Sequence, residues 1–336
     1  MKEAIVGPGP KVEIIDSPIP KPNADQVLIR VVVSGSNPKD WKVPDWRRVT
    51  VNQGDDIAGI VEEVGSNVIE FKPGDRVAGF HEFMTPNGSY AEYAISWQHT
   101  TFHLPQQTTF EEGAAIPLAA MTAALGLYAS LGLPQPWTPT MEPTPLIIYG
   151  AASAVGAYAV QFAAQSNIHP LICIAGNSQT YVEKLIDRSK GDVIIDYRDG
   201  DVAVVEALKK TAGESKLLYA LDAVSEKNSY VNLSEVLAEG SKITLVLPPK
   251  EDYVFPSHIS HSVTIVGSVH SDSKDFGFVY LRYITRGLQE GWFKPQPQEV
   301  VPGGLRGIQK GLENLKAGKA HAIKYVFRIA DTEGLQ

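Results

Sequence analysis

The feature that most constrains the fold is a regular alternation of strand-type and helix-type segments that begins at residue 146. Short apolar segments typical of buried strands cover residues 146–149, 170–175, 193–196, 217–223, 242–247 and 263–269. Helix-type segments stand between the first five of them, at residues 154–166, 179–189, 202–211 and 230–238. Strands and helices that alternate at this spacing form right-handed crossovers. The sequence therefore predicts a doubly wound parallel sheet.

The chain before this alternation has a different pattern. The first 115 or so residues favour strands and turns, with β-branched segments at residues 27–33, 57–64 and 76–79. A helix-type segment at 114–130 and a connection with five prolines at 133–145 follow. Two helix-type segments and a strand-type segment close the chain, at 278–289, 305–316 and 323–329. We expect an α/β protein with two domains, one formed by residues 1–118 with 272–336 and one by residues 119–271.

Composition excludes several classes of protein. The 336 residues are 43% hydrophobic and 20% charged, which is typical of a globular chain with a sizeable core. The net charge of −8, without any run of five like charges, disfavours a nucleic acid partner. A single cysteine, Cys173, excludes a disulfide framework and a cysteine-rich zinc site. The sequence has no signal-peptide pattern and no apolar stretch of ~18 residues, so we expect a cytoplasmic protein away from membranes.

A turn of small residues, 150–156, joins the first strand-type segment of the alternation to its helix. Small side chains there let backbone amides and a helix N-terminus approach a pyrophosphate. The strict G-x-G-x-x-G pattern is incomplete, because Ala151 and Ser153 stand where its first two glycines would, counting back from Gly156. A tight turn without a ligand is the alternative, and the position after the first strand of the series favours a dinucleotide.

The loop after the second strand-type segment bears on which dinucleotide binds. A site for NAD would show an acid about 20 residues after the first turn, holding the ribose 2′-hydroxyl. Residues 176–180 contain no acid, and instead carry amide and hydroxyl groups, Asn177 and Ser178 among them. This favours NADPH over NADH. No lysine or arginine lies within the loop, and Arg198 can assist from the next one.

Several motifs resemble one family in the expected order. They are GDDIAGIVEEVG at residues 54–65, FKPGDRVAG at 71–79, GSYAEY at 88–93, EGAAIPL at 112–118, the turn at 150–156 and IDYR at 195–198. Together they cover essentially the whole chain, which resembles the medium-chain dehydrogenase/reductase superfamily. The resemblance implies a GroES-like, β-barrel-type catalytic domain and a Rossmann cofactor domain.

The resemblance also bears on zinc. Zinc alcohol dehydrogenases of this superfamily use a cysteine after the third strand, a His-Glu pair in the glycine hairpin and a later cysteine. Here Asn37 stands at the first position and Asp55-Asp56 at the pair, and the later cysteine is missing. The chain is thus similar to the zinc-free branch, which includes quinone oxidoreductases and enoyl reductases. Without a Lewis acid, simple alcohol oxidation is disfavoured.

The segment SGSNPKDWK at residues 34–42 looks like the Asn-Pro-x-Asp motif that borders the nicotinamide in this branch. That motif and the ending KYVFRIADT at 324–332 are similar to a fungal group, which includes CipB-like oxidoreductases and trans-acting enoyl reductases of polyketide pathways.

The resemblance implies three catalytic candidates. Lys42 would donate a hydrogen bond to a substrate carbonyl or hold the cofactor ribose, and the alternative is a solvated surface lysine. Tyr90, on the strand-like motif at 88–93, would donate a proton or only pack. Asn37 would bind substrate or cofactor amide, or only shape the turn before Pro38.

It also implies contacts with the cofactor. Thr122 is placed at a helix start beside the nicotinamide, with helix capping as its alternative, and Tyr197 is placed by the adenine or the 2′-phosphate. The expected contacts are Lys39, Asp40, Trp41, Lys42, Thr122, Ala152, Ser153, Ala154, Val155, Gly156, Asn177, Ser178, Tyr197, Leu245, Leu247 and Lys324.

Taken together, these features indicate an NADPH-dependent, metal-independent reductase that transfers hydride to an activated C=C or C=O bond. Its substrate would be a small electrophile such as an enone, a quinone or a reactive carbonyl. NADPH would lie in a cleft between the domains, across the carboxyl ends of the parallel strands. Two alternatives stay open: a non-catalytic NADPH sensor or scaffold, and a partner-dependent enoyl reductase that acts on carrier-bound chains of a polyketide pathway.

The last expectation concerns assembly. Residues 263–269 are apolar and β-branched, and we expect them to form the edge strand of the parallel sheet. An exposed edge of this kind favours pairing with a second copy, so a homodimer is preferred over a monomer. The alternative is that residues 270–277 fold back over the edge and leave a monomer.

Overall fold

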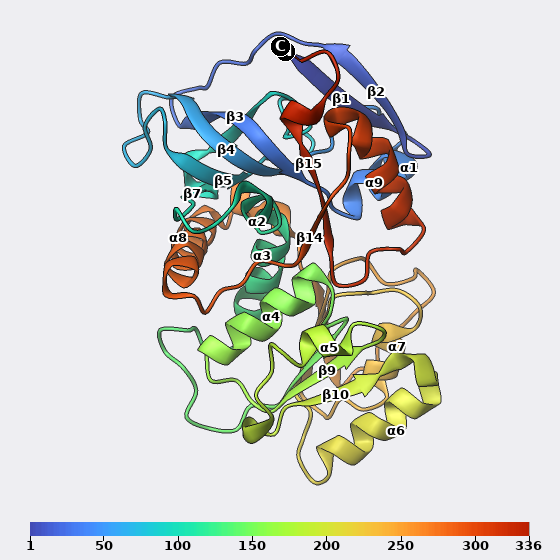
Figure 1. Ribbon diagram of the computed structural model, residues 1–336. Coiled ribbons are helices and arrows are strands. Elements are labelled where there is room, and N and C mark those ends of the chain that lie inside the picture. Colours follow the sequence, from blue (N-terminus) through green and yellow to red (C-terminus); the bar gives the residue numbers. More distant parts are fainter. Residues whose placement is uncertain (336) are drawn as a thin grey trace. The chain divides into compact units, whose positions relative to one another are not determined.

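The computed structural model describes residues 1–335 and divides the chain into two compact units (Figure 1). Unit 1 consists of Met1–Met121 and of the chain from Gly267 onward, and unit 2 is Thr122–Val266. The C-terminal part of the chain therefore folds with the N-terminal part. No helix within residues 1–335 has both the length and the apolar character that crossing a membrane requires.

Unit 1 is built on a largely antiparallel sheet. Its central strand, β3 (Gln26–Gly35), pairs with β4, β6 and the C-terminal strand β15. The strands follow the order β14 (Gln298–Val300), β15 (Lys324–Arg328), β3, β4 (Asp56–Val64), β5 (Arg76–Phe80) and β7 (Thr101–His103), and β6 (Tyr93–Trp97) joins β3 off this path. A separate hairpin joins β1 (Lys2–Gly7) to β2 (Lys11–Asp16).

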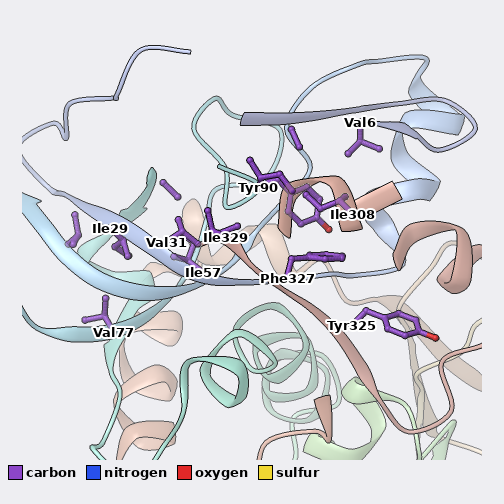
Figure 2. Packing of buried hydrophobic residues seen from close by; sticks show 14 of the residues in the cluster. Val6, Ile29, Val31, Ile57, Val77, Tyr90, Ile308, Tyr325, Phe327 and Ile329 are labelled. Atoms are coloured by element: carbon purple, nitrogen blue, oxygen red, sulfur yellow. The ribbon is translucent and has the colours of Figure 1, made fainter. Parts of the chain in front are cut away.

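The core of unit 1 follows from the period-two pattern of these strands. Ile29 and Val31 of β3 lie beside Ile57 and Val77 of the neighbouring strands, and Phe327 of β15 joins the same cluster (Figure 2). Alternate β-branched residues point to one face of a strand, and Ile29 and Val31 of β3 therefore enter the same cluster. Each such side chain contributes about 1.5–3 kcal/mol when fully buried.

Helices flank this sheet. The C-terminal ones, α8 (Lys274–Glu290) and α9 (Gly307–Lys316), contact β7 and β15 respectively (Figure 1). The short helix α1 (Lys39–Arg47) was not expected from the strand-and-turn pattern of the first 115 residues. It begins after Pro38 and ends at Arg48, which has a left-handed backbone with φ of 54°.

The helix expected over residues 114–130 is interrupted. Instead, α2 (Phe110–Ala114) ends early, α3 (Pro117–Ala124) starts anew, and residues Leu125–Ser130 form a π-helical turn. Pro117 occupies the first position of α3, where the lack of an N–H is tolerated. Thr109 and Glu112 form a capping box that begins α2.

Unit 2 contains the expected doubly wound sheet. All six of its strands are parallel: β8 (Leu146–Tyr149), β9 (Leu171–Ala175), β10 (Val193–Asp196), β11 (Tyr219–Asp222), β12 (Ser241–Leu245) and β13 (Ile259–Val263). Their spatial order is β10-β9-β8-β11-β12-β13. Numbered along the chain this is 3-2-1-4-5-6, the Rossmann order, with its switch point between β8 and β11. The predicted fold class is confirmed.

Two of the connecting helices have nearly the predicted extents, α4 (Ala154–Gln165) and α6 (Asp201–Ala212). The other two are shorter than predicted. The segment 179–189 forms only α5 (Gln179–Val182) before turns begin, and 230–238 forms only α7 (Ser229–Ser234). Short helices have few internal hydrogen bonds, so their lengths depend on packing more than on composition.

The last strand was predicted wrongly. The edge strand is β13 (Ile259–Val263), and residues Val266–His270 form a 3-10 helix instead of the expected strand over 263–269. Thr264, the residue after β13, still donates its backbone amide to the Leu245 carbonyl at 2.8 Å, and its hydroxyl lies 2.7 Å from the Thr244 hydroxyl. Val269 is fully buried and belongs to unit 1. The true edge carries the exposed residues Ser260 and His261, so the apolar edge on which the homodimer prediction rested does not exist.

Candidate functional site

The turn between β8 and α4 has the geometry expected of a dinucleotide-binding turn. Gly150 has a φ of +78°, and the Ser153 hydroxyl accepts a hydrogen bond from the Gly156 amide at 3.1 Å, which caps α4. A Cβ on Gly156 would lie 2.2 Å from the carbonyl oxygen of Gly150, so only glycine fits there. Residues 152–155 are half-buried. The turn is thus as tight as backbone contact with a phosphate requires.

The loop after β9 lies beside the loop after β10. The ring of Tyr197 lies against Gly176, since a Cβ on Gly176 would be 2.7 Å from it, and Tyr197 is 47% exposed. The Arg198 guanidinium forms an ion pair with Asp196 at 2.5 Å and also donates to the Asn177 amide oxygen. Arg198 therefore reaches the loop in which the sequence placed the 2′-phosphate.

Asp196, the last residue of β10, pairs with Arg198, and its charge is thereby neutralised. Hydrogen bonding by the Arg198 side chain lowers the pKa of Asp196 to about 2. The amide of Gln179 also donates to this carboxylate at 2.6 Å. An acid held in this way is a poor partner for a ribose 2′-hydroxyl, and the arginine beside it can face a phosphate.

Three other expected cofactor contacts, Leu245, Leu247 and Thr122, are less exposed than Tyr197. Leu245, on β12, is fully buried in the core of unit 2, and Leu247 is half-buried just beyond the end of that strand. Thr122 lies near the end of α3, which begins at Pro117, so it neither starts nor caps that helix as expected. These leucines and Thr122 remain predicted contacts.

The motif at residues 34–42 folds around a buried carboxylate, Asp56. Asn37 donates from its side-chain amide to Asp56 Oδ2 at 2.8 Å, and its amide oxygen accepts from Lys324 Nζ at 2.7 Å. Lys324 Nζ also donates to Asp56 Oδ2 at 2.7 Å. Asp56 Oδ1 accepts from the Leu118 backbone amide at 2.7 Å. A single carboxylate therefore joins β4 to the start of α1, to β15 and to α3.

The ion pair between Lys324 and Asp56 is almost fully buried, with side-chain exposures of 4% and 0%. From the sequence, Lys324 is expected to contact the cofactor, and Asp56 stands at a position where zinc alcohol dehydrogenases carry a zinc ligand. In the structure each neutralises the other. A buried pair of this kind is stable only when its remaining hydrogen-bonding capacity is also met, which Asn37 and the Leu118 amide do here.

A second buried cluster surrounds Lys39. Its ammonium lies 2.6 Å from Asp55 Oδ2 and 3.1 Å from Asp40 Oδ1, and it donates to the Gln53 carbonyl at 2.5 Å. Burial raises the pKa of both Asp40 and Asp55 to about 6, and the Lys39 ammonium opposes that rise. Lys39 and Asp40, two expected cofactor contacts, therefore have polar partners inside unit 1.

Tyr90 is also part of this cluster. It lies in the loop between β5 and β6, not on a strand, and it is fully buried (Figure 2). Its hydroxyl donates to Asp40 Oδ2 at 2.6 Å, and its ring meets Phe327 edge-to-face at 5.7 Å. Burial, with Asp40 beside it, holds the pKa of Tyr90 well above its usual value. The structure supports the packing alternative, and a catalytic role for Tyr90 stays a prediction.

Lys42 is buried, so it is not the solvated surface lysine that was the alternative to a functional role. The residue is only 6% exposed, and its ammonium lies 5.4 Å from the centre of the Trp41 ring and 5.8 Å from that of Trp46. Trp41 Nε1 is itself buried without a hydrogen-bond partner within residues 1–335. The helix α1 thus carries a shielded cation and an indole N–H on adjacent residues.

No group of three or more His, Cys, Asp or Glu side chains within residues 1–335 is arranged to hold a metal ion. The positions that correspond to zinc ligands in alcohol dehydrogenases are Asn37, Asp55 and Asp56, and they bind lysine ammonium groups instead. Sequence reasoning missed this compensation. The available signal was the pair of adjacent acids at the start of an apolar strand, because buried carboxylates need buried cations.

Comparison with known proteins agrees with this geometry. Residues 23–106 match a family model described as the alcohol dehydrogenase GroES-like domain. The chain is 56% identical over 312 residues to the trans-enoyl reductase fsr4 of Gibberella fujikuroi, covering 91% of this chain and 92% of that one. It is 30% identical to the trans-enoyl reductase pvhC of Talaromyces variabilis, covering 94% and 93%.

Solved structures share the fold at low sequence identity. The CurK enoyl reductase aligns with a TM-score of 0.76 at 20% identity, covering 97% of this chain and 98% of that one. The quinone oxidoreductase from Coxiella burnetii aligns with a TM-score of 0.75 at 22% identity, covering 98% and 99%. Together with the identity to the fungal reductase, the GroES-like match and the Rossmann strand order, this shows that the chain belongs to the medium-chain dehydrogenase/reductase superfamily.

Proposed function

We propose that this protein is an NADPH-dependent, metal-independent oxidoreductase that reduces an activated C=C bond. The observation that carries the proposal is the tight turn at Gly156, which follows the first strand of a sheet in Rossmann order. The choice of C=C over C=O is supported by the relatives named trans-enoyl reductases. One of them is more than half identical to this chain.

The residues of unit 2 fit a dinucleotide with a 2′-phosphate. The backbone amides of residues 151–156 and the start of α4 would hold the pyrophosphate. Asn177, Ser178 and Arg198 would hold the 2′-phosphate, with Tyr197 beside the adenine. In unit 1, Asn37, Lys39, Asp40, Trp41, Lys42 and Lys324 stay predicted contacts of the nicotinamide. When bound, the nicotinamide supplies a hydride.

Lys42 is the residue of this chain best suited to assist that transfer. As a C–H bond forms at the β-carbon, the π electrons of the C=C bond move toward the substrate carbonyl, whose oxygen gains negative charge. The shielded Lys42 ammonium would donate a hydrogen bond to that oxygen, and its low exposure strengthens the interaction. A proton from water then completes the reduction at the α-carbon.

Replacement of Lys42 by Met tests this role. Loss of one preorganised donor to a developing oxyanion is expected to lower kcat about 10²- to 10³-fold while NADPH still binds. Lys310→Met, an exposed lysine of α9, is the matched control and should leave kcat unchanged. An unchanged kcat in Lys42→Met would remove Lys42 from the mechanism.

The reaction itself is tested by following NADPH oxidation with enones, quinones, reactive carbonyls and enoyl thioesters. We expect turnover with conjugated C=C substrates. Tight NADPH binding without turnover of any of them would indicate the sensor or scaffold. Turnover only when the acyl chain is borne by a carrier protein would indicate the partner-dependent enoyl reductase.

A further inference from the structure

The loop at residues 223–228 follows β11, next to the switch point of the parallel sheet. Three of its residues have left-handed backbones, with φ of 56° at Ser225, 51° at Lys227 and 64° at Asn228. Only eight non-glycine residues in the described part of the chain have a positive φ, so this short loop carries an unusual share of them. A backbone of this kind persists only where its surroundings hold it, and such positions concentrate at functional sites.

One carboxylate holds the first half of this loop. Asp222, the last residue of β11, is fully buried. Its Oδ1 accepts from the backbone amides of Val224 at 2.9 Å and of Ser225 at 2.8 Å. Its Oδ2 accepts from the Ser229 hydroxyl at 2.5 Å. The path of the chain just after β11 is therefore set by the side chain of Asp222.

The same loop packs against the turn that we assign to the dinucleotide. A Cβ on Gly150 would lie 2.6 Å from Val224 Cγ2, so the valine side chain lies directly against that glycine. The Ala223 amide donates to the Tyr149 carbonyl at 3.0 Å, which joins the two chain segments where β8 and β11 end. Asp222 thus reaches the turn through Val224, whose amide it binds.

The carboxylate itself is unsuited to contact the cofactor. Within residues 1–335 its hydrogen-bond partners are two amides and a hydroxyl, with no cation among them. Asp56, by contrast, is a buried carboxylate that pairs with a lysine, Lys324. A negative charge that no cation neutralises cannot attract a pyrophosphate. What Asp222 can contribute is the shape of the loop.

We propose that Asp222 is a positioning residue for the dinucleotide: it holds Val224 against Gly150 and so keeps the turn at 150–156 in the conformation that receives the pyrophosphate. This rests on the proposed function. A turn that already has its bound conformation loses less freedom when the ligand binds, which strengthens binding. NADPH and NADH both carry the pyrophosphate, so Asp222 should affect the two cofactors equally. The loop at 176–180, in contrast, is proposed to distinguish them.

The test measures the Kd of NADPH and of NADH by calorimetry for Asp222→Ala and Asp222→Asn. Alanine removes both acceptor atoms, and we expect the Kd of each cofactor to rise about 10-fold. Asparagine keeps an oxygen for the two backbone amides and gains a donor for the Ser229 hydroxyl, so both Kd values should stay within about twofold of the wild type. In steady-state assays of Asp222→Ala, the KM for the cofactor should rise while kcat stays nearly unchanged.

Asp192→Ala is the matched control for the loss of a buried carboxylate in unit 2. Asp192 is 1% exposed and accepts from the backbone amides of Leu171 and Asp187 and from the His169 ring. It lies where β9 and β10 begin, at the opposite end of the sheet from the turn. We expect this variant to lose stability and to keep both Kd values. An equal rise of both Kd values in Asp192→Ala would overturn the proposal.

Val224→Ala tests the path from Asp222 to the turn, and it carries the test alone if Asp222→Ala does not fold. It removes the γ-carbon that lies against Gly150, so both Kd values should rise. Asp222→Ala/Val224→Ala should bind no more weakly than Asp222→Ala, because the two residues act through one contact. Unchanged Kd values in either single variant, a loss confined to NADPH, or additive losses of binding free energy would each overturn the proposal.

If the wild-type protein binds neither cofactor, the proposed function fails, and hydrogen exchange still tests the positioning. Faster exchange of the amides of residues 150–156 in Asp222→Ala than in Asp192→Ala would support the role of Asp222 in holding the turn. Equal exchange in the two variants would overturn it.

Discussion

At the scale of single residues, the ion pair between Lys324 and Asp56 illustrates how unit 1 stabilises its buried charges. The two residues are 268 positions apart and join β15 to β4. Removal of one partner leaves the other charge buried and unpaired. We expect Lys324→Met to lower the free energy of unfolding by about 3–5 kcal/mol, measured by denaturant titration.

The double variant Lys324→Met/Asp56→Asn removes both charges, and its loss of unfolding free energy should be smaller than the sum of the losses of the two single variants. A loss equal to their sum would show that the two residues do not interact.

His270 gives a pH-dependent effect at the same scale. Its Nε2 donates to the Phe80 carbonyl at 3.1 Å, and burial lowers the pKa of His270 to about 4. The folded protein then binds fewer protons than the unfolded chain between pH 6.5 and 4, so stability falls as the pH decreases through that window. The contribution of His270 is about 1.4 kcal/mol per pH unit.

His270→Gln keeps a donor for the Phe80 carbonyl but does not titrate. When unfolding free energies are measured from pH 7 to 4, the wild type should therefore lose stability more steeply than this variant as the pH falls. Glu82, His81 and His99 also face His270, and their contributions remain in both proteins. Parallel curves would contradict the assignment.

At the scale of elements, the loops after β9 and β10 decide the cofactor. Ser178→Asp places a negative charge where the 2′-phosphate is proposed to lie. We expect it to weaken NADPH binding by on the order of 1–3 kcal/mol, by repulsion, and to leave NADH binding nearly unchanged. Calorimetry with both cofactors measures this. Equal or tighter binding of NADH by the wild type would show that the loop does not select the phosphate.

The elements that could be predicted from the sequence are those set by local pattern. The strands β8 and β10 have the predicted bounds, because β-branched residues between turn residues specify a buried strand. The turn at Gly156 is likewise local in sequence. Helix α1 was missed because contacts distant in sequence hold it, such as the ion pair of Lys39 with Asp55.

Contacts distant in sequence also explain why the edge strand was predicted wrongly. Residues 263–269 have the composition of a strand, yet Val269 packs inside unit 1, beside Gly277. Tertiary packing overrides local preference where a segment passes from one unit to the other. The buried clusters around Asp56 and Lys39 were unforeseen for a related reason, since nothing local in the sequence shows which lysine reaches which carboxylate.

At the scale of the whole molecule, the chain combines a GroES-like unit with a Rossmann unit. The domain boundaries at residues 118 and 272 and the cleft between the domains remain predictions. The homodimer also remains a prediction, and it now lacks the apolar edge from which it was inferred, because the edge strand β13 exposes Ser260 and His261. Light scattering at micromolar concentration would decide between one chain and two.

The central claim is hydride transfer from NADPH to an activated C=C bond. The most direct measurement uses NADPH deuterated at the transferable C4 position, with an enone and an enoyl thioester as substrates, and locates the label by mass spectrometry and NMR. We predict one deuterium at the β-carbon and an intact carbonyl. Deuterium at the carbonyl carbon, or bound NADPH that is never oxidised, would contradict the account.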